Sequence, residues 1–189
     1  MIRIGIVGDI GSGKSYVAKQ FGYPVFNADV EIVKLYRKSR KCYKKLKKEL
    51  PKYVVSFPIN KKEISRAIID SHNNLKKIVK IIHPEIRSTM NKFIKKNKNK
   101  KIVVLDIPLL MENKINKRND IIIFVDSRRK EINKRLNKKK NLKILKKFKK
   151  LQLPLEIKKK KSDFIIKNNF NNKVKKNVKR VLEKILLND

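Results

Sequence analysis

Short apolar runs alternate with helical patterns along most of the chain. Five runs have the length and the β-branched composition of strands, at residues 1–7, 25–27, 102–106, 121–126 and 164–166. The third and fourth runs are apolar throughout, as in strands with both faces buried. Because helical patterns separate most of the runs, we expect a single α/β domain over residues 1–189, with a parallel five-stranded sheet flanked by helices.

Between the second and third strands the pattern is wholly helical. Apolar residues recur at helical spacing over residues 30–50, 60–68, 73–82 and 85–94. We expect an interruption near residues 38–41, a cap at Asn60, and a break or kink at His83-Pro84, because proline lacks the N–H that a helix uses. The segment at about 30–100 therefore reads as a helical insert.

The last third of the chain continues the alternation. A helix is expected around residues 131–136, followed by a strongly basic stretch at 138–161 that Leu153-Pro154 divides. The C-terminal helix places six apolar residues on one face, namely Val174, Val178, Val181, Leu182, Ile185 and Leu186.

Composition adds a large positive charge to this picture. The chain has 53 Lys and Arg against 16 Asp and Glu, a formal net charge of +37. Such a charge attracts polyanions. The lysines are spread along the chain and accompanied by many Asn and Ile, which is typical of compositional drift, so we expect no specific nucleic-acid partner.

Targeting signals and cysteine pairs are absent from the sequence. No apolar run is long enough to span a membrane, and the first residues lack the pattern of a signal peptide. Cys42 is the only cysteine, so no intramolecular disulfide is possible. We expect a cytoplasmic location without a membrane partner.

The segment Gly8-Asp9-Ile10-Gly11-Ser12-Gly13-Lys14-Ser15 stands between the first strand and a helix that begins near Tyr16. It fits G-x-x-x-x-G-K-[S/T] at every fixed position and in the required strand–loop–helix context. In such a P-loop the backbone N–H groups surround phosphate oxygens. Lys14 would reach the β- and γ-phosphates, and the Ser15 hydroxyl would bind Mg²⁺. Residues 8–16 are thus predicted to bind a nucleoside triphosphate.

Two acids follow predicted strands, at the edge of a parallel sheet where ligands bind. Asp29 comes just after the second strand and is a candidate for orienting or deprotonating an attacking hydroxyl, although it could also cap a helix. Asp106 ends the third strand and could either hold Mg²⁺ through water or cap the following turn.

The ordered set of motifs resembles the dephospho-CoA kinase family over nearly the whole chain. The resemblance is carried by the P-loop and by Asn27-Ala28-Asp29, Ile82-His83-Pro84, Asp106-Ile107-Pro108-Leu109-Leu110-Met111-Glu112, Lys134-Arg135, and Ser162 to Asn169. It implies a P-loop kinase fold in which the insert at 30–100 binds the acceptor and the stretch at 137–161 forms a basic lid. It also implies transfer of the γ-phosphoryl of ATP to the ribose 3′-hydroxyl of dephospho-CoA, the last step of coenzyme A synthesis.

The resemblance also assigns roles to individual residues. Asp29 would be the catalytic base, and His83, Pro108, Leu109 and Leu110 would line the acceptor site. Arg135 would stabilise charge on the transferred phosphoryl group or stack on adenine. Asn168 would lie in an adenine-binding loop or simply favour a turn, and Glu112 receives no definite role.

Several positions depart from the family's pattern. Asn27 replaces the first acid of Asp-Ala-Asp, and Lys61 stands where arginine is common. Residues 137–140 have Lys and Asn where an arginine is usual, and Phe170 replaces a glycine. Because lysine lacks the bidentate guanidinium group of arginine, phosphate contacts in the lid are less defined than those in the P-loop.

Two other functions compete with this prediction. A nucleoside monophosphate kinase would need cations for the acceptor's phosphate, which Arg66 and Arg87 could supply. A nucleic-acid-binding NTPase would suit the charge, but the sequence has neither an Asn-Lys-x-Asp signature nor an acid pair after the strand at 102–106.

Overall fold

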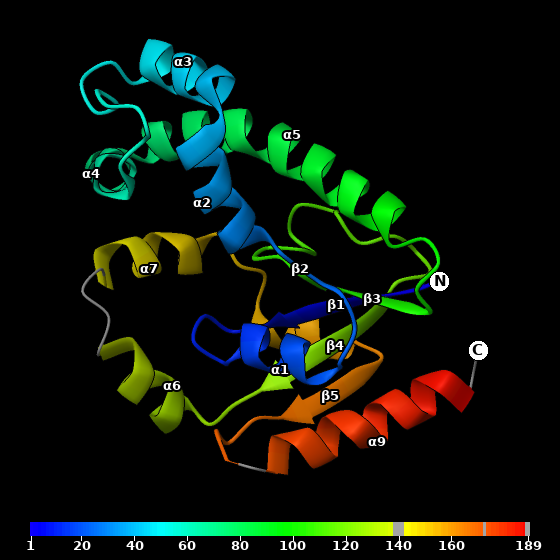
Figure 1. The fold of residues 1–189 in the computed structure, drawn as a ribbon. Helices are drawn as coiled ribbons and strands as arrows, with labels where there is room; N and C mark the ends of the chain where they lie inside the picture. The colour runs from blue at the N-terminus through cyan, green and yellow to red at the C-terminus, as the bar shows by residue number, and fades with distance from the viewer. Residues whose placement is uncertain (138–141, 172, 188–189) are drawn as a thin grey trace. The chain divides into compact units, whose positions relative to one another are not determined.

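The computed structural model describes residues 1–137, 142–171 and 173–187 (Figure 1). The chain forms two compact units. The first comprises Met1–Asn27 and Asn97–Asp189, and the second comprises Ala28–Lys96.

A five-stranded sheet organises the first unit (Figure 1). Its strands are β1 (Ile2–Gly8), β2 (Val25–Asn27), β3 (Ile102–Asp106), β4 (Ile121–Asp126) and β5 (Phe164–Lys167). They lie in the order β2-β3-β1-β4-β5, and every neighbouring pair is parallel. The predicted parallel five-stranded sheet is confirmed.

The register brings the carboxyl ends of the strands to one edge of the sheet. Asn27 of β2 is opposite Asp106 of β3, and Gly8 of β1 is opposite Val125 of β4. Between β4 and the edge strand β5, Asp126 is opposite Lys167. The polar residues that end the strands are therefore neighbours at this edge, where parallel sheets bind ligands.

One face of the sheet packs against two helices, α1 (Lys14–Gln20) and α9 (Lys173–Leu187). Alternate residues of the strands point into this core, including Ile4, Ile6 and Ile123, all fully buried. The apolar face predicted for the C-terminal helix is confirmed, since Val178 and Ile185 are only 1% and 2% exposed. Burial of a side chain of this size contributes about 1.5–3 kcal/mol. This core fixes the strand from which the P-loop emerges.

Helices α6 (Arg129–Asn137), α7 (Leu142–Lys150) and α8 (Leu155–Lys160) occupy the segment between β4 and β5. The helices of the basic stretch are separated at residues 151–154, as Leu153-Pro154 predicts. Residues 138–141, which include most of the stretch 137–140 in which the family usually has an arginine, lie outside the described residues.

The second unit is built from four helices, α2 (Ala28–Lys38), α3 (Arg40–Glu49), α4 (Lys61–Asp70) and α5 (His72–Lys96). The interruption predicted near residues 38–41 lies at Ser39, whose Oγ accepts a hydrogen bond of 3.1 Å from the Cys42 N–H and caps α3. Asn60 caps α4, because its Oδ1 accepts a hydrogen bond of 2.9 Å from the Lys62 N–H. The helical insert is present as the sequence pattern indicates.

Of the break or kink expected at His83-Pro84, the break is absent from the described helix. Helix α5 runs without interruption from His72 to Lys96, with Pro84 inside it. Buried residues along one face, including Ile82 and Ile86 on either side of the proline, hold the helix together. Pro84 is exposed, so water can hydrogen-bond to the carbonyl that loses its helical partner. Tertiary packing therefore overrides the local preference.

Within the described residues, no helix combines the length and the apolar composition that crossing a membrane requires. Even α5, with 25 residues, is interspersed with lysines and other polar side chains.

Candidate active site

The P-loop connects β1 to α1 at the carboxyl edge of the sheet. The Ser12 N–H donates to the Asp9 carbonyl over 3.2 Å, and the Tyr16 and Val17 N–H groups both donate to the Gly13 carbonyl over 3.0 Å. Gly13 has φ of 86°, and a Cβ there would lie 2.3 Å from Nδ2 of Asn168. Only glycine fits this position, because any side chain would meet both backbone strain and a buried amide.

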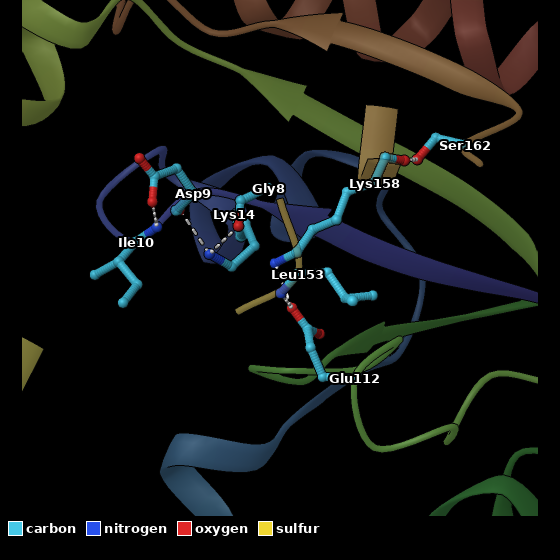
Figure 2. A network of polar contacts seen from close by, with 8 residues as sticks. All are labelled: Gly8, Asp9, Ile10, Lys14, Glu112, Leu153, Lys158 and Ser162. Atoms are coloured by element: carbon cyan, nitrogen blue, oxygen red, sulfur yellow. Dashed lines mark hydrogen bonds and ion pairs between the residues drawn. The ribbon is translucent and has the colours of Figure 1, made fainter. Parts of the chain in front are cut away.

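Lys14 lies over the first residues of the loop. Its Nζ donates to the carbonyls of Gly8, at 3.2 Å, and Asp9, at 2.8 Å (Figure 2). The ammonium group is thus held against the loop that would receive phosphates. This placement suits a cation that contacts phosphate oxygens of a bound nucleotide.

Two side chains that follow other strands of the sheet hydrogen-bond to the P-loop. The Ser12 carbonyl accepts one hydrogen bond of 2.9 Å from Ser127 Oγ and another of 2.8 Å from Asn168 Nδ2. Ser127 follows β4, and Asn168 follows β5. Because the carbonyl is tied to these donors, the conformation of the loop is set by the sheet itself before any ligand binds.

The sequence predicts that Asn168 lies in an adenine-binding loop or favours a turn, and in the structure it follows β5 and contacts the P-loop. It is fully buried, and its Oδ1 accepts a hydrogen bond of 3.0 Å from the Phe170 N–H while its Nδ2 binds Ser12. Both ends of the amide are thus engaged within the protein. In this conformation the Asn168 side chain supports the P-loop, and contact of the loop around Asn168 with adenine stays a prediction.

Ser15 and Asp106 are brought together through Asn27. The Asn27 Nδ2 donates to Asp106 Oδ2 and, over 3.4 Å, to Ser15 Oγ. Asp106 is 3% exposed, whereas Ser15 is exposed. A hydroxyl and a carboxylate are oxygen ligands that suit Mg²⁺, which takes few protein ligands and completes its shell with phosphates and water. The residues present therefore fit the predicted magnesium ion, although the described residues include no cluster of three or more His, Cys, Asp or Glu able to hold a metal alone.

Arg135 lies in the last turn of α6, beside the loop that follows β5. Its guanidinium carbon lies 4.4 Å from the centre of the Phe170 ring, a cation–π contact. Phe170 has φ of 57°, the left-handed region that a glycine would enter without strain. Helix α6 also reaches the P-loop, because Ile132 and Leu136 lie within 3.2 Å of where a Cβ on Gly11 would be. Arg135 therefore lies near the P-loop, and its guanidinium group is held by stacking on Phe170, a contact that the sequence did not predict.

The residues after β3 have different environments. Leu110 is 1% exposed, and its side chain fills the space beside Gly5 of β1. Pro108 is exposed, and Leu109 is half-buried with φ of 58°. Leu110 therefore contributes to the core, whereas Pro108 and Leu109 remain accessible. Glu112, which had no definite role, pairs with Lys158 of α8 over 2.6 Å.

The other predicted residues belong to the second unit. Asp29 is exposed in the first turn of α2, so its carboxylate also faces the positive end of that helix. His83 lies on α5 and is half-buried. Burial, with a smaller effect of the nearby Arg87 guanidinium, lowers the pKa of the His83 imidazole below its ordinary value. His83 is therefore neutral at physiological pH.

Three further residues have contacts in the site that the sequence did not single out. Ser127 supports the loop, Lys149 of α7 lies 3.8 Å from Asp9 Oδ2, and Lys158 binds Glu112. No pattern distinguishes the two lysines from the other basic residues of this chain. Ser127 could have been noticed as a hydroxyl directly after a strand that ends at the ligand-binding edge.

Comparison with known proteins gives a consistent result. A family model described as Dephospho-CoA kinase matches residues 2–174. A dephospho-CoA kinase from Wolbachia sp. subsp. Brugia malayi is 35% identical over 127 residues, and the match covers 65% of this chain and 65% of that relative. Less than two thirds of that relative is therefore matched.

Solved structures extend the likeness to almost the whole chain. The structure of TT1252 from Thermus thermophilus has a TM-score of 0.77 and 27% identity, covering 99% of this chain and 97% of its own. A dephospho-CoA kinase from Campylobacter jejuni has a TM-score of 0.63 at 22% identity, covering 97% and 96%, and so shares the fold. With the family model matched over residues 2–174, the chain belongs to the dephospho-CoA kinase family.

Proposed function

We propose that this protein transfers the γ-phosphoryl group of ATP to the ribose 3′-hydroxyl of dephospho-CoA, producing CoA and ADP. The observation that carries the proposal is the P-loop, whose Ser12 carbonyl is tied to Ser127 and Asn168 and whose Lys14 ammonium group lies on the loop. Membership of the family supplies the acceptor.

On the donor side, the chain contributes position and charge. The N–H groups of residues 8–16 and the Lys14 ammonium group would bind the β- and γ-phosphates and stabilise the charge that develops on them. Ser15 and Asp106 would hold Mg²⁺, which supplies further positive charge when bound. Arg135 would add a guanidinium contact, either to the phosphates or to the base.

On the acceptor side, Asp29 would accept the proton of the 3′-hydroxyl as its oxygen attacks the γ-phosphorus. Asp29 is two positions after Asn27, which contacts Ser15 and Asp106, so the chain itself limits the distance between the two backbone positions to about 7 Å. His83, Pro108 and Leu109 would contact the acceptor. Leu110, which is buried in the core, would support the acceptor-site residues Pro108 and Leu109 from behind.

The larger organisation follows from these roles. Residues 28–96 would form the acceptor-binding subdomain of a single kinase domain, and residues 137–161 would form a lid. Closure of a lid over ATP would exclude water and suppress hydrolysis. A cytoplasmic location suits this activity because ATP is its phosphoryl donor, and neither a membrane nor a specific nucleic acid is required.

The test is a coupled assay with Mg²⁺, ATP and either dephospho-CoA or a panel of nucleoside monophosphates, with products identified by mass. ADP formation and a CoA product with dephospho-CoA alone would support the proposal. Transfer to another acceptor in its place would refute the assigned substrate.

A pair of variants then tests the base. Asp29→Asn should lower kcat by about 10²–10⁴-fold while ATP binding is retained. Glu31→Gln is the matched control, because Glu31 is another acid of the first turn of α2 and pairs with Lys34 at the surface. An Asp29→Asn variant as active as this control would remove Asp29 from the mechanism.

A further inference from the structure

Lys158 is an exception among the basic residues. Among the lysines and arginines that the structure describes, it is the only one that is buried, with 2% of its surface exposed. Its Nζ lies 2.6 Å from Oε1 of Glu112, whose side chain is 9% exposed. Moving both charges out of water costs several kcal/mol for each ion, and an apolar pair of similar volume often stabilises a fold as well or better. Stability alone therefore does not explain why Glu112 and Lys158 form a buried ion pair, and the positions that the pair fixes offer an explanation.

Glu112 holds two points of the lid segment at once. The oxygen that pairs with Lys158 also accepts a hydrogen bond of 3.0 Å from the Leu153 N–H (Figure 2). Leu153 lies in the connection between α7 and α8, and Lys158 lies in α8. Ser162 Oγ closes the end of this helix by donating to the Lys158 carbonyl over 2.7 Å. One carboxylate thus fixes the junction of the two helices.

Glu112 is itself attached to the sheet. It follows β3 in a tight turn in which Leu110 packs against Gly5 of β1, and the Ile115 N–H donates to the Leu110 carbonyl over 3.0 Å. Helix α8 lies against β1, the strand that leads into the P-loop. The junction of α7 and α8 is therefore fixed relative to the nucleotide loop and not merely to other parts of the lid.

The junction in turn sets the end of α7. The Gln152 N–H donates to the Lys149 carbonyl over 3.1 Å, so the residue next to Leu153 is bonded directly to the last turn of the helix. The Lys149 ammonium group lies 3.8 Å from Oδ2 of Asp9 in the P-loop. The lysine of this pair is exposed, and a surface ion pair of this kind contributes too little to hold α7 in place. The junction therefore determines the position of Lys149, whose ammonium group can leave the Asp9 carboxylate to bind a more highly charged anion.

We propose that Glu112 and Lys158 are positioning residues for phosphoryl transfer, which fix the junction of α7 and α8 so that Lys149 contacts the phosphates of the donor nucleotide. The inference rests on the proposed use of ATP at the P-loop. Triphosphate oxygens carry more charge than one carboxylate, so Lys149 leaves Asp9 for them when the donor binds.

The first test compares neighbouring lysines of α7. Lys149→Ala should weaken ATP binding and lower kcat/KM for ATP by about tenfold, the loss of one charge-assisted contact. Lys150→Ala is the matched control, because Lys150 is also exposed at the end of α7, and it should stay within about twofold of the parent. Equal effects of the two substitutions would overturn the assignment of Lys149 and indicate only a general effect of charge.

The second test asks whether Glu112 acts through Lys149. Glu112→Gln keeps an oxygen for Leu153 but removes the charge that binds Lys158. Its loss in kcat/KM for ATP should not add to that of Lys149→Ala, because the combined variant has no further contact to lose. Additive losses in this double-mutant cycle would show that Glu112 does not work through Lys149.

A third variant separates positioning from stability. Glu112→Leu with Lys158→Met replaces the pair by apolar side chains and should melt close to the parent's temperature, because removal of two buried charges offsets the lost hydrogen bond of the Leu153 N–H. It should nevertheless lose about tenfold in kcat/KM for ATP, because the Leu153 N–H no longer has a carboxylate partner. If this variant had the same kcat/KM for ATP as the parent, the proposal would be overturned. The same would hold if the decrease in kcat/KM for ATP among these variants simply followed their decrease in melting temperature. ATP binding, measured by calorimetry without an acceptor, keeps these outcomes distinct from a failure of dephospho-CoA as the substrate.

Discussion

Asn168 offers a direct test of whether the sheet preforms the P-loop. Its amide donates to the Ser12 carbonyl over 2.8 Å and accepts from the Phe170 N–H over 3.0 Å, and the side chain is fully buried. Asn168→Ala removes both hydrogen bonds and leaves a space next to Gly13. The Ser12 carbonyl keeps one partner, Ser127 Oγ, so the loop is loosened without leaving that carbonyl unpaired.

The size of the effect follows from these contacts. Each intramolecular hydrogen bond contributes about 0.5–1.5 kcal/mol, so the two together account for about 2 kcal/mol. For a chain of this size a loss of 1 kcal/mol lowers Tm by about 2–4 °C, which gives a decrease of about 4–8 °C. If the loop must be ordered again on binding, the same free energy weakens ATP binding by up to about 30-fold.

The assay combines thermal unfolding with calorimetric titration of ATP. Asn169→Ala is the control, because Asn169 is the adjacent asparagine and is exposed. We expect Asn168→Ala to lose both Tm and ATP affinity, and Asn169→Ala to retain both. If Asn168→Ala bound ATP as tightly as the control, the loop would not depend on this support and our account of its preformed geometry would be wrong.

Three other predictions follow from the site. The pKa of His83 is lowered in the folded chain, so the unfolded chain binds a proton at this imidazole more readily. The contribution of His83 to the free energy of unfolding is therefore complete above about pH 6.5 and decreases as the pH falls. Urea unfolding at about pH 7.5 and about pH 5.5 should therefore show a smaller acid-induced loss for His83→Gln than for the parent, and equal losses would count against it. Ser15→Ala should raise the Mg²⁺ concentration for half-maximal activity by about tenfold, with the exposed Ser88→Ala as an unchanged control. Arg135→Gln should lower kcat/KM for ATP by about tenfold but change stability by only about 0.5–1 kcal/mol, and a loss of stability without a kinetic effect would limit Arg135 to its contact with Phe170.

The sequence predicts the sheet and the phosphate loop well because both depend on local patterns. Continuous apolar runs such as 102–106 are sufficient to mark strands buried on both faces, and the P-loop carries its requirements in its own residues. The polar residues that end β2 and β3 could be expected at one edge from the parallel topology alone. Their link through Asn27 depends on a register that no local pattern contains.

The remaining features depend on contacts between distant segments. Glu112 and Lys158 are 46 positions apart, and a lysine among so many lysines gives no sign that it is buried. Pro84 illustrates the opposite case, in which a strong local signal is outweighed by apolar residues on both sides of it. Asn168 was recognised by its position after the last strand, but its orientation toward Ser12 is a property of the folded loop.

The supports of the Ser12 carbonyl also set an order of events during synthesis. A ribosome makes the P-loop at residues 8–15 well before the side chains that hold it, which come from residues 127 and 168. The two contacts span 115 and 156 positions of sequence. A nascent chain therefore carries its nucleotide motif early but cannot complete the loop until β5 has been made and has paired with β4. Nucleotide binding by this protein is thus a late event in its folding, and ATP can act as a ligand that favours the finished chain over its shorter precursors.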